Sequence, residues 1–195
     1  MSKKVIIASN NQGKIKEFTE ILSPLGYEVV SQSEAVGEIE VEENGSTFAE
    51  NALIKAQAIY DITDCAVIAD DSGLCVEALG GRPGIYSARY APKGEECQKL
   101  LDEMKDVPEE KRSAYFECAI VMMDDGFIYN ASGRCEGKIG HEMLGTNGFG
   151  YDPIFVYGDK TIAQMTADEK NKISHRAKAL QQLCDILKKK EDGLC

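Results

Sequence analysis

The chain has 195 residues, of which 43% are hydrophobic and 28% charged, and its formal net charge is −11. This composition is that of a globular protein with room for a sizeable core, and no apolar run is long enough to span a bilayer. The excess of acids argues against a protein that coats a nucleic acid polymer. A small polyanionic ligand stays possible if basic residues converge locally or a metal ion bridges the acids to it.

Neither the start of the chain nor its cysteines indicate export. Only four apolar residues follow the first four residues, too few for a signal-peptide core, so we expect a cytoplasmic protein with no membrane partner. The seven cysteines are odd in number and form no C-x-x-C pair, which indicates neither a zinc site nor a disulfide framework. We expect mostly reduced core thiols, with Cys195 exposed at the tail.

The first predicted elements are a strand, a polar loop and a helix. The strand covers residues 5–8 and the loop residues 9–14, and Gly26 is placed to end the helix. The apolar face of this helix carries Ile15, Phe18, Ile21, Leu22 and Leu25. A short strand near residues 27–30 and an acidic loop over residues 38–45 come next.

A second helix leads to the most informative segment of the chain. Thr47 and Glu50 predict a capping box at its start. The residues expected to face inward are Phe48, Ala52, Ala56 and Ile59. The apolar strand 66–69 then runs straight into Asp70-Asp71-Ser72-Gly73, which places the two acids at the end of that strand.

The second half of the chain departs from a regular βαβ order. A short helix is predicted around residues 97–104, and strands 115–123 and 127–131 flank Asp124-Asp125-Gly126 as a β-hairpin. A Gly-rich loop over residues 145–153 precedes a strand at 154–156.

Two further helices, capped by Thr166 with Glu169 and by Ser174, close the chain. We therefore expect one α/β domain over residues 1–195, with a mixed central sheet, flanking helices and two lobes around a substrate cleft.

The adjacent acids Asp70 and Asp71 are the first candidates for catalysis. Ligands of open α/β sheets gather beyond the carboxyl ends of strands, and two neighbouring carboxylates repel each other unless a cation or a shared proton holds them. Mg²⁺ is the first candidate, and Glu42 could add an oxygen to an ion held by Asp71. The alternatives are a solvated turn at the aspartates, and plain surface charge at Glu42 as at Glu40 and Glu43.

Two clusters could hold phosphate. The loop Ser9-Asn10-Asn11-Gln12-Gly13-Lys14 opens a helix, where backbone N–H groups and the helix dipole favour anions and Lys14 adds a point charge. It is neither a Walker A loop nor a G-x-G-x-x-G fingerprint, so a plain connection is the alternative. Lys55 could reach the same phosphates, although a lone helical lysine is more often a solvated side chain.

One further cluster suits a purine ring, and another could contact a common ligand. Phe149-Gly150-Tyr151-Asp152 offers a stacking surface and an acceptor carboxylate, the alternative being a turn whose aromatic rings anchor in the core. Lys170 and the pair His175-Arg176 stand at successive helix starts and could point at one ligand.

Taken together, six segments resemble the inosine/xanthosine triphosphate pyrophosphatase family, in order and with compatible spacing over nearly the whole chain. The segments are residues 9–14, 47–52, 69–74, 84–89, 149–152 and 173–176. The resemblance implies an enzyme that hydrolyses deaminated purine nucleoside triphosphates (ITP, dITP and XTP) to the monophosphate and pyrophosphate, and so cleanses the nucleotide pool. It also implies two lobes around a central cleft and a homodimer.

The resemblance further implies a role for each cluster. Asp71 would be the proton acceptor and a Mg²⁺ ligand, Glu42 a second metal ligand, and Ser72 a substrate contact. Residues 9–14 with Lys55 and Lys170 would hold the triphosphate, and residues 149–152 with His175 and Arg176 the base. Donors aimed at a 6-oxo group, from His175, Arg176 or backbone N–H groups, would be left unpaired by adenine.

Two alternatives compete with this assignment. A Maf-like pyrophosphatase acting on other nucleotides would be favoured by a Ser-Pro-Arg-Arg type loop after the first strand, which is not the sequence of residues 9–14. A non-catalytic nucleotide sensor would be favoured by loss of Lys14 or Asp71, and both are present.

Overall fold

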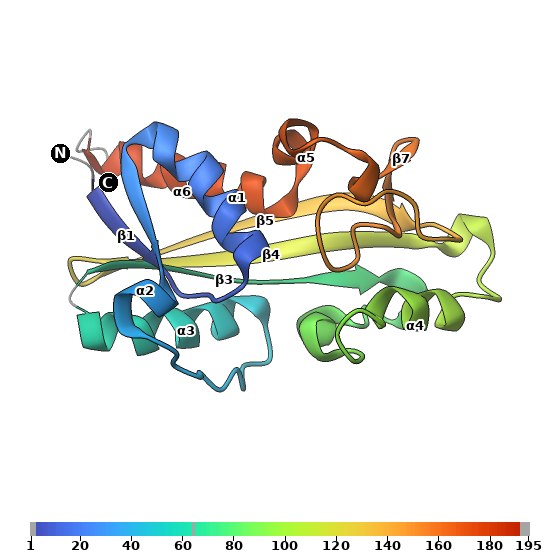
Figure 1. Ribbon diagram of the computed structural model, residues 1–195, viewed down its shortest axis with the longest axis horizontal. Coiled ribbons are helices and arrows are strands. Elements are labelled where there is room, and N and C mark those ends of the chain that lie inside the picture. The colour runs from blue at the N-terminus through green and yellow to red at the C-terminus, as the bar shows by residue number, and fades with distance from the viewer. Residues whose placement is uncertain (1–2, 64, 192–195) are drawn as a thin grey trace. The chain divides into compact units, whose positions relative to one another are not determined.

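The computed structural model of the chain describes residues 3–63 and 65–191 (Figure 1). Its helices are α1 (Gln12–Leu22), α2 (Gln32–Val36), α3 (Phe48–Thr63), α4 (Glu96–Glu103), α5 (Ala167–Ile173) and α6 (His175–Glu191). Its strands are β1 (Lys3–Ile7), β2 (Tyr27–Ser31), β3 (Ala66–Val76), β4 (Ser113–Asp124), β5 (Phe127–Ile139), β6 (Phe155–Tyr157) and β7 (Lys160–Thr161). The elements thus alternate between helix and strand in the first half and become strand-rich in the second.

The described strands form one seven-stranded mixed sheet, in the order β2-β1-β3-β4-β5-β6-β7. Strand β1 is parallel to β2 and to β3, with Val5 opposite Ala66, whereas β6 is antiparallel to β5 and β7. The turn between β4 and β5 consists of Asp125 and Gly126, both with positive φ, as the predicted hairpin requires. The predicted fold class, a mixed central sheet with flanking helices, is confirmed; the substrate cleft stays a prediction.

The chain divides into two compact units, and three long strands contribute to both. The first unit comprises Met1–Asp71, Cys118–Gly133 and Arg176–Cys195, and the second Ser72–Glu117 and Arg134–His175. Strands β3, β4 and β5 therefore each have one part in each unit.

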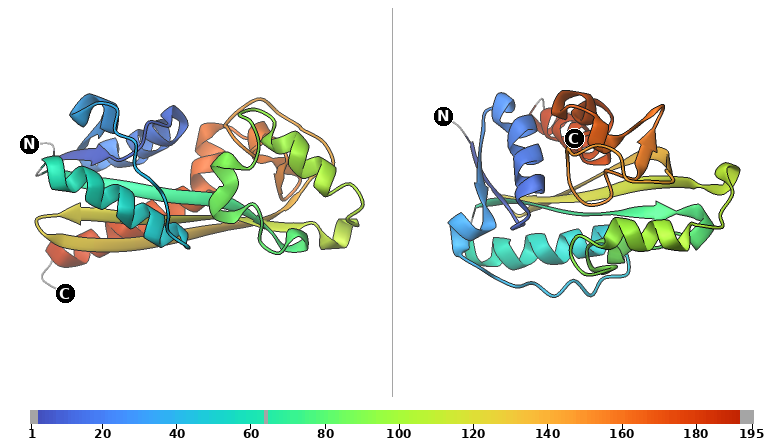
Figure 2. Two further views of the ribbon diagram at one scale, coloured as in Figure 1. Left: turned by 90° about the horizontal axis from the view of Figure 1, so that it is seen from below. Right: turned by 45° about the vertical axis from the view of Figure 1, so that its right-hand side comes forward.

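In the first unit, helices cover both faces of the sheet. Ile68 of β3 packs in one core cluster with Phe18 of α1 and Leu180 of α6. Its neighbour Val67 packs in another cluster with Ala56 of α3. Because successive side chains of a strand point to opposite faces, α3 lies on the opposite side of the strands from α1 and α6, as Figures 1 and 2 show.

The second unit has its own core. Leu74 of β3 and Phe116 of β4 pack there with Leu100 of α4 and with Ile154 and Ile162 from the segment around β6 and β7. This core surrounds Tyr151, and therefore anchors part of the predicted base-binding loop.

Several predicted details are confirmed. Gly26 ends the first helical segment in the left-handed conformation at φ 87°, and Thr166 with Glu169 forms both halves of a capping box. The four residues predicted to face inward from α3 are all buried.

Other details differ from the prediction. Leu25 is 48% exposed, because α1 ends at Leu22 and a 3₁₀ turn re-aims the chain before Gly26. Helix α2, strand β7 and the extension of β5 to Ile139 were not predicted.

The described cysteines agree with the expectation of reduced core thiols. The six cysteines within the described part of the chain are free, and all but Cys65 are buried. Cys195 lies outside the described residues. No described helix is long and apolar enough to cross a membrane.

We expect Arg112 to be the most sensitive position of the second unit. Its side chain is 1% exposed and donates to the carbonyls of Ile139 (2.8 Å), Met104 (2.7 Å), Val107 (3.2 Å) and Gly140 (2.6 Å). Arg112→Met would leave these buried acceptors without their donors and should lower the free energy of unfolding by on the order of 3 kcal/mol in urea titrations. Lys111→Met, at the exposed neighbour, is the control; equal stability of the two variants would contradict the prediction.

Candidate active site

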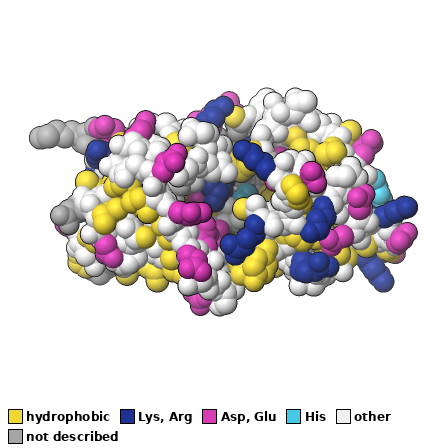
Figure 3. Space-filling model, turned by 60° about the horizontal axis from the view of Figure 1, so that its bottom comes forward, with side chains coloured by type: hydrophobic (Ala, Val, Ile, Leu, Met, Phe, Trp, Pro, Cys, Tyr) yellow, Lys and Arg dark blue, Asp and Glu magenta, His cyan; other side chains and the backbone are white. Residues whose placement is uncertain are grey.

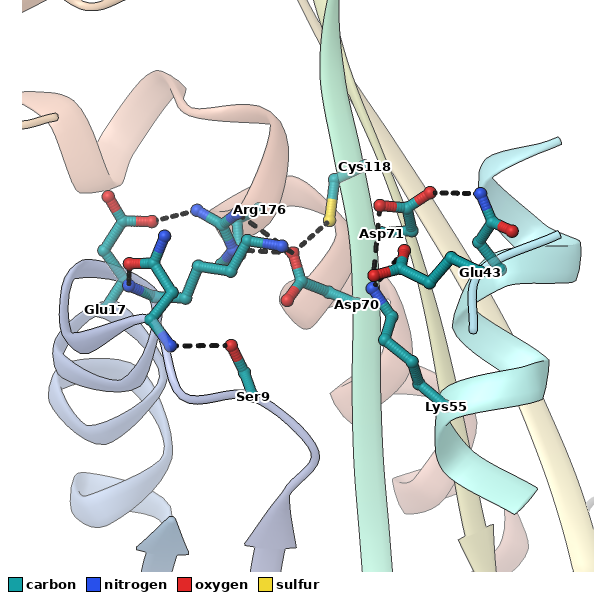
Figure 4. A network of polar contacts seen from close by, with 11 residues as sticks. Ser9, Glu17, Glu43, Lys55, Asp70, Asp71, Cys118 and Arg176 are labelled. Atoms are coloured by element: carbon teal, nitrogen blue, oxygen red, sulfur yellow. Dashed lines mark hydrogen bonds and ion pairs between the residues drawn. The ribbon is translucent and has the colours of Figure 1, made fainter. Parts of the chain in front are cut away.

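Strand β3 runs straight through the two aspartates, which corrects their predicted position at the end of the strand. The strand continues to Val76, so Asp70 and Asp71 lie in its interior and not beyond its end. Adjacent strand residues face opposite sides of a sheet. Figure 4 shows the result: Asp70 points toward Arg176 and Glu17, and Asp71 points the other way, toward Lys55 and Glu43. The two acids therefore do not act as one adjacent carboxylate pair.

Asp70 lies in a buried ion network. Its Oδ2 is 2.9 Å from Arg176 Nη2 and 3.1 Å from Lys14 Nζ, and Cys118 Sγ donates to it at 3.9 Å. Arg176 also pairs with Glu17. Burial opposes ionisation of Asp70, but the charges of Lys14 and Arg176 outweigh it and hold the pKa of Asp70 well below its usual range. Asp70 is therefore a fixed anion that positions two cations.

Asp71 has a different environment. Asn51 Nδ2 donates to Asp71 Oδ2 at 3.0 Å, and Lys55 Nζ lies 3.6 Å from Asp71 Oδ1. Burial raises the pKa of Asp71 and outweighs the opposing effects of Lys55 and Asn51. A carboxylate with a raised pKa is a better proton acceptor than an ordinary aspartate, so Asp71 suits the role of a general base.

The acidic loop places Glu43, and not Glu42, beside this carboxylate. Lys55 Nζ is 2.9 Å from Glu43 Oε2, whereas the Glu42 side chain is exposed. Asn51 fixes the end of the loop, because its Oδ1 accepts from Gly45 N at 2.8 Å. A Cβ atom on Gly45 would lie 2.7 Å from that same oxygen, so the approach requires glycine.

The donor set at Asp71 fits Mg²⁺. Asp71 and Glu43 present hard carboxylate oxygens to a shared cation, the Lys55 ammonium. No group of three or more His, Cys, Asp or Glu side chains suited to a metal occurs within residues 3–63 and 65–191. Mg²⁺ commonly uses one or two carboxylates and completes its coordination with water and substrate phosphates, so two carboxylates suffice.

The loop predicted to hold phosphate opens α1. Asn11 is the N-cap residue, and its Oδ1 accepts from Lys14 N at 3.2 Å, while Asn11 N donates to Ser9 Oγ at 3.1 Å. Asn10 and Gln12 are exposed and Gly13 is half-buried. The structure thus brings the loop and Lys14 to the start of an 11-residue helix, whose dipole favours an anion.

In the second unit, the predicted base-binding loop forms a cluster with Lys170, which the resemblance assigned to the triphosphate. Asp152 Oδ2 accepts from Lys170 Nζ at 2.7 Å and from Phe149 N at 2.9 Å, and the Lys170 ammonium lies 4.7 Å from the centroid of the Phe149 ring. A side chain at Gly148 would collide with the Asp152 carboxylate. The loop is therefore folded tightly around Asp152.

The two aromatic residues of this loop differ in position. Phe149 is half-buried and Gly150 exposed, but Tyr151 is 5% exposed, and its hydroxyl donates to Ser87 O at 2.9 Å. The Tyr151 ring is thus part of the core and anchors the loop. This agrees with the alternative prediction for Tyr151, that of a turn anchored in the core by its aromatic rings.

His175 and Arg176 are neighbours in sequence but belong to different units. His175 is buried and stacks on Phe116, with ring centroids 4.8 Å apart, whereas Arg176 joins the Asp70 network of the first unit. Ser72 is half-buried on β3 directly after Asp71.

Three residues near the aspartates were not assigned a function from the sequence: Glu17, Asn51 and Cys118. Helix spacing could have found two of them. Asn51 precedes Lys55 by four residues and Glu17 follows Lys14 by three, so each shares a helix face with a predicted site residue. Nothing in the sequence pattern distinguishes Cys118 from the other core cysteines.

Acidic and basic side chains are interspersed on the face of the molecule drawn in Figure 3. That face therefore does not present a continuous basic surface to an anion.

Comparisons with known proteins agree with this chemistry. The model of the Ham1 family matches residues 5–186. The dITP/XTP pyrophosphatase of Bacillus subtilis (strain 168) is 50% identical over 192 residues, covering 95% of this chain and 97% of the relative. That of Escherichia coli (strain K12) is 45% identical over 194 residues, covering 95% and 98%.

Solved structures agree as well. The Staphylococcus aureus Ham1 protein matches with a TM-score of 0.84 and 43% identity over 96% of this chain and 100% of that one. A HAM1 protein from Coxiella burnetii matches with a TM-score of 0.85 and 40% identity over 96% and 99% of the chains. The chain described here belongs to the Ham1 family.

Proposed function

We propose that this chain is a nucleoside triphosphate pyrophosphatase that hydrolyses deaminated purine nucleotides, ITP, dITP and XTP, to the monophosphate and pyrophosphate. The names of the relatives support the substrate class. The observation that carries the chemistry is Asp71, a buried carboxylate with a raised pKa beside Lys55 and Glu43. As the resemblance implies, we propose a cytoplasmic homodimer that cleanses the nucleotide pool.

The proposed reaction divides the work chiefly among residues of the first unit, with Ser72 of the second. Asp71 accepts a proton from the water that adds to the α-phosphorus, and the bond from that phosphorus to the bridging oxygen of pyrophosphate breaks. Lys14, Lys55 and the backbone of residues 9–14 neutralise the phosphate oxygens, which lowers the barrier to charge redistribution. Mg²⁺, held by Asp71 and an acidic-loop glutamate, would supply further positive charge to the phosphates. Ser72 contacts the substrate.

We assign base recognition chiefly to the second unit. Donors aimed at the 6-oxo group, from His175 or backbone N–H groups, would be left unpaired by the 6-amino group of adenine, and Lys170, which donates to Asp152, stays proposed for the triphosphate. The half-buried Phe149 ring offers a stacking face, and His175 and Gly150 belong to the same unit. Since Arg176 is engaged by Asp70 and Glu17, we propose that it acts on the site through Asp70.

The experiment that tests this function compares pyrophosphate release from ITP, XTP, ATP, GTP and the pyrimidine triphosphates, with Mg²⁺ and with chelator. We expect a strong preference for ITP and XTP that is lost with chelator. Equal turnover of ATP, or a preference for a pyrimidine, would assign the chain to the Maf-like alternative, and no turnover at all would favour a sensor.

Two glutamine variants should decide which acidic-loop residue serves the metal. Because Glu43 lies beside Lys55 and Asp71, we expect Glu43→Gln to raise the Mg²⁺ concentration for half-maximal turnover by about tenfold or more. Glu42→Gln, which removes the same charge from the exposed neighbour, should change it little. The reverse pattern would restore Glu42 as the ligand predicted from the sequence.

A further inference from the structure

Lys55 stands between two carboxylates that belong to the proposed metal site. Its ammonium is 2.9 Å from Glu43 Oε2 and 3.6 Å from Asp71 Oδ1, and Figure 4 shows both acids turned toward it. The Lys55 and Asp71 side chains are only 13% and 11% exposed, so water screens this contact poorly. The ammonium therefore offsets one of the two negative charges.

Asp71 and the end of the acidic loop are held by a residue other than Lys55. Asn51 donates to the other oxygen of Asp71 at 3.0 Å and accepts from Gly45 N, two residues beyond Glu43. Asn51, at the start of α3, thus holds Asp71 and the backbone of the adjoining loop, whereas Lys55 reaches the two acids through a flexible four-carbon stem. The ammonium can leave while Asp71 and the loop backbone that carries Glu43 stay in place.

An ammonium and a divalent cation cannot occupy this position together. A cation bound by the same two carboxylates would come within a few ångströms of the Lys55 charge, where repulsion is strong in a poorly screened setting. The part of the chain that the structure describes offers no third acidic ligand to offset that repulsion.

We infer that Lys55 is a built-in counter-ion that keeps divalent metal out of the nucleotide-free protein and yields its place when a triphosphate binds. The inference rests on the proposed function, which supplies the phosphates. Their oxygens attract the Lys55 ammonium away from Glu43 and Asp71, and the two carboxylates are then available to the cation that accompanies the nucleotide. Metal and nucleotide consequently bind together, and the free protein binds metal weakly.

The test measures Mn²⁺ binding to the nucleotide-free, full-length chain by the electron paramagnetic resonance signal of free Mn²⁺. We expect Lys55→Met to bind Mn²⁺ about tenfold or more tightly than the parent, because the competing charge is gone. Lys55→Arg, which keeps the charge, should bind as weakly as the parent. Lys16→Met removes the same charge from an exposed site on α1 and corrects for the change in net charge.

The gain in Mn²⁺ affinity should also depend on Glu43. Adding Glu43→Gln to Lys55→Met should abolish the tighter binding. Lys55→Met that binds no more tightly than Lys16→Met, or a parent that binds Mn²⁺ as tightly as Lys55→Met, would overturn the inference. If Lys55→Met does not fold, tight binding by the parent or by Lys55→Arg is the overturning result, and weak binding by both supports the inference.

Because this assay uses no nucleotide, its outcome is separate from that of the proposed function. If the parent hydrolyses ITP but Lys55→Met binds Mn²⁺ no more tightly than the parent, only the counter-ion role of Lys55 is rejected. If Lys55→Met binds Mn²⁺ more tightly but the parent hydrolyses no triphosphate, only the proposed activity is rejected.

Discussion

Replacing Asp71 by asparagine is expected to lower kcat for ITP by about 10²- to 10⁴-fold, the usual contribution of a general base. The fold should persist, because the asparagine Oδ1 can still accept the hydrogen bond from Asn51 that Asp71 accepts now. Initial rates of pyrophosphate release, with circular dichroism to verify folding, measure the effect. Asp61→Asn on the exposed surface of α3 is the matched control. A variant that retains more than about a tenth of the parent kcat would remove Asp71 from the catalytic role.

The pH dependence gives a second measurement of the same assignment. A base must be ionised to act, and burial places the pKa of Asp71 above its ordinary value. In the parent, kcat/KM should therefore fall as the pH drops through that raised pKa. The residual activity of Asp71→Asn should not show this fall of kcat/KM at low pH. If the fall is unchanged in the variant, it is caused by a group other than Asp71.

The site shows where sequence patterns succeed and where they fail. Helix periodicity predicted the inner face of α3, and the same periodicity places Asn51 with Lys55 beside Asp71. The strand at Asp70 was missed because Asp, Ser and Gly are poor strand formers on their own. What keeps these residues extended is tertiary: Asp70 is paired with Lys14 and Arg176, which come from distant parts of the chain.

The missed strand had a further consequence. Once Asp70 and Asp71 are in a strand, alternation alone places them on opposite faces, and the idea of one adjacent acid pair fails. The choice among Glu40, Glu42 and Glu43 could not be made in this way, because an irregular loop has no period. It depends on the hydrogen bond from Gly45 to Asn51, which only the folded chain shows.

Replacing Arg176 by methionine should lower the free energy of unfolding by about 3–5 kcal/mol, a larger loss than that expected for Arg112→Met. Arg176 is 1% exposed and pairs with Asp70 and Glu17, so its removal leaves two buried carboxylates, of which Asp70 keeps Lys14 as a partner. Urea titrations near neutral pH measure the loss. Adding Asp70→Asn and Glu17→Gln should recover part of it, because the two buried carboxylates are then gone and only Lys14, whose side chain is 16% exposed, loses the charge of its partner; a loss below about 1 kcal/mol would contradict the prediction.

The sign of the pH effect distinguishes this electrostatic cause from lost packing. The pKa of Asp70 is depressed in the folded state, so its ionised form stabilises the protein above the unfolded pKa of about 3.9, and this contribution is lost as the pH falls below that value. Arg176→Met removes much of the depression, so the variant has less of this contribution to lose. The stability difference between parent and variant should therefore shrink as the pH falls below about 4. A difference that stays constant down to that range would indicate that Arg176 acts through packing, and not as the counter-ion that keeps Asp70 charged beside Lys14.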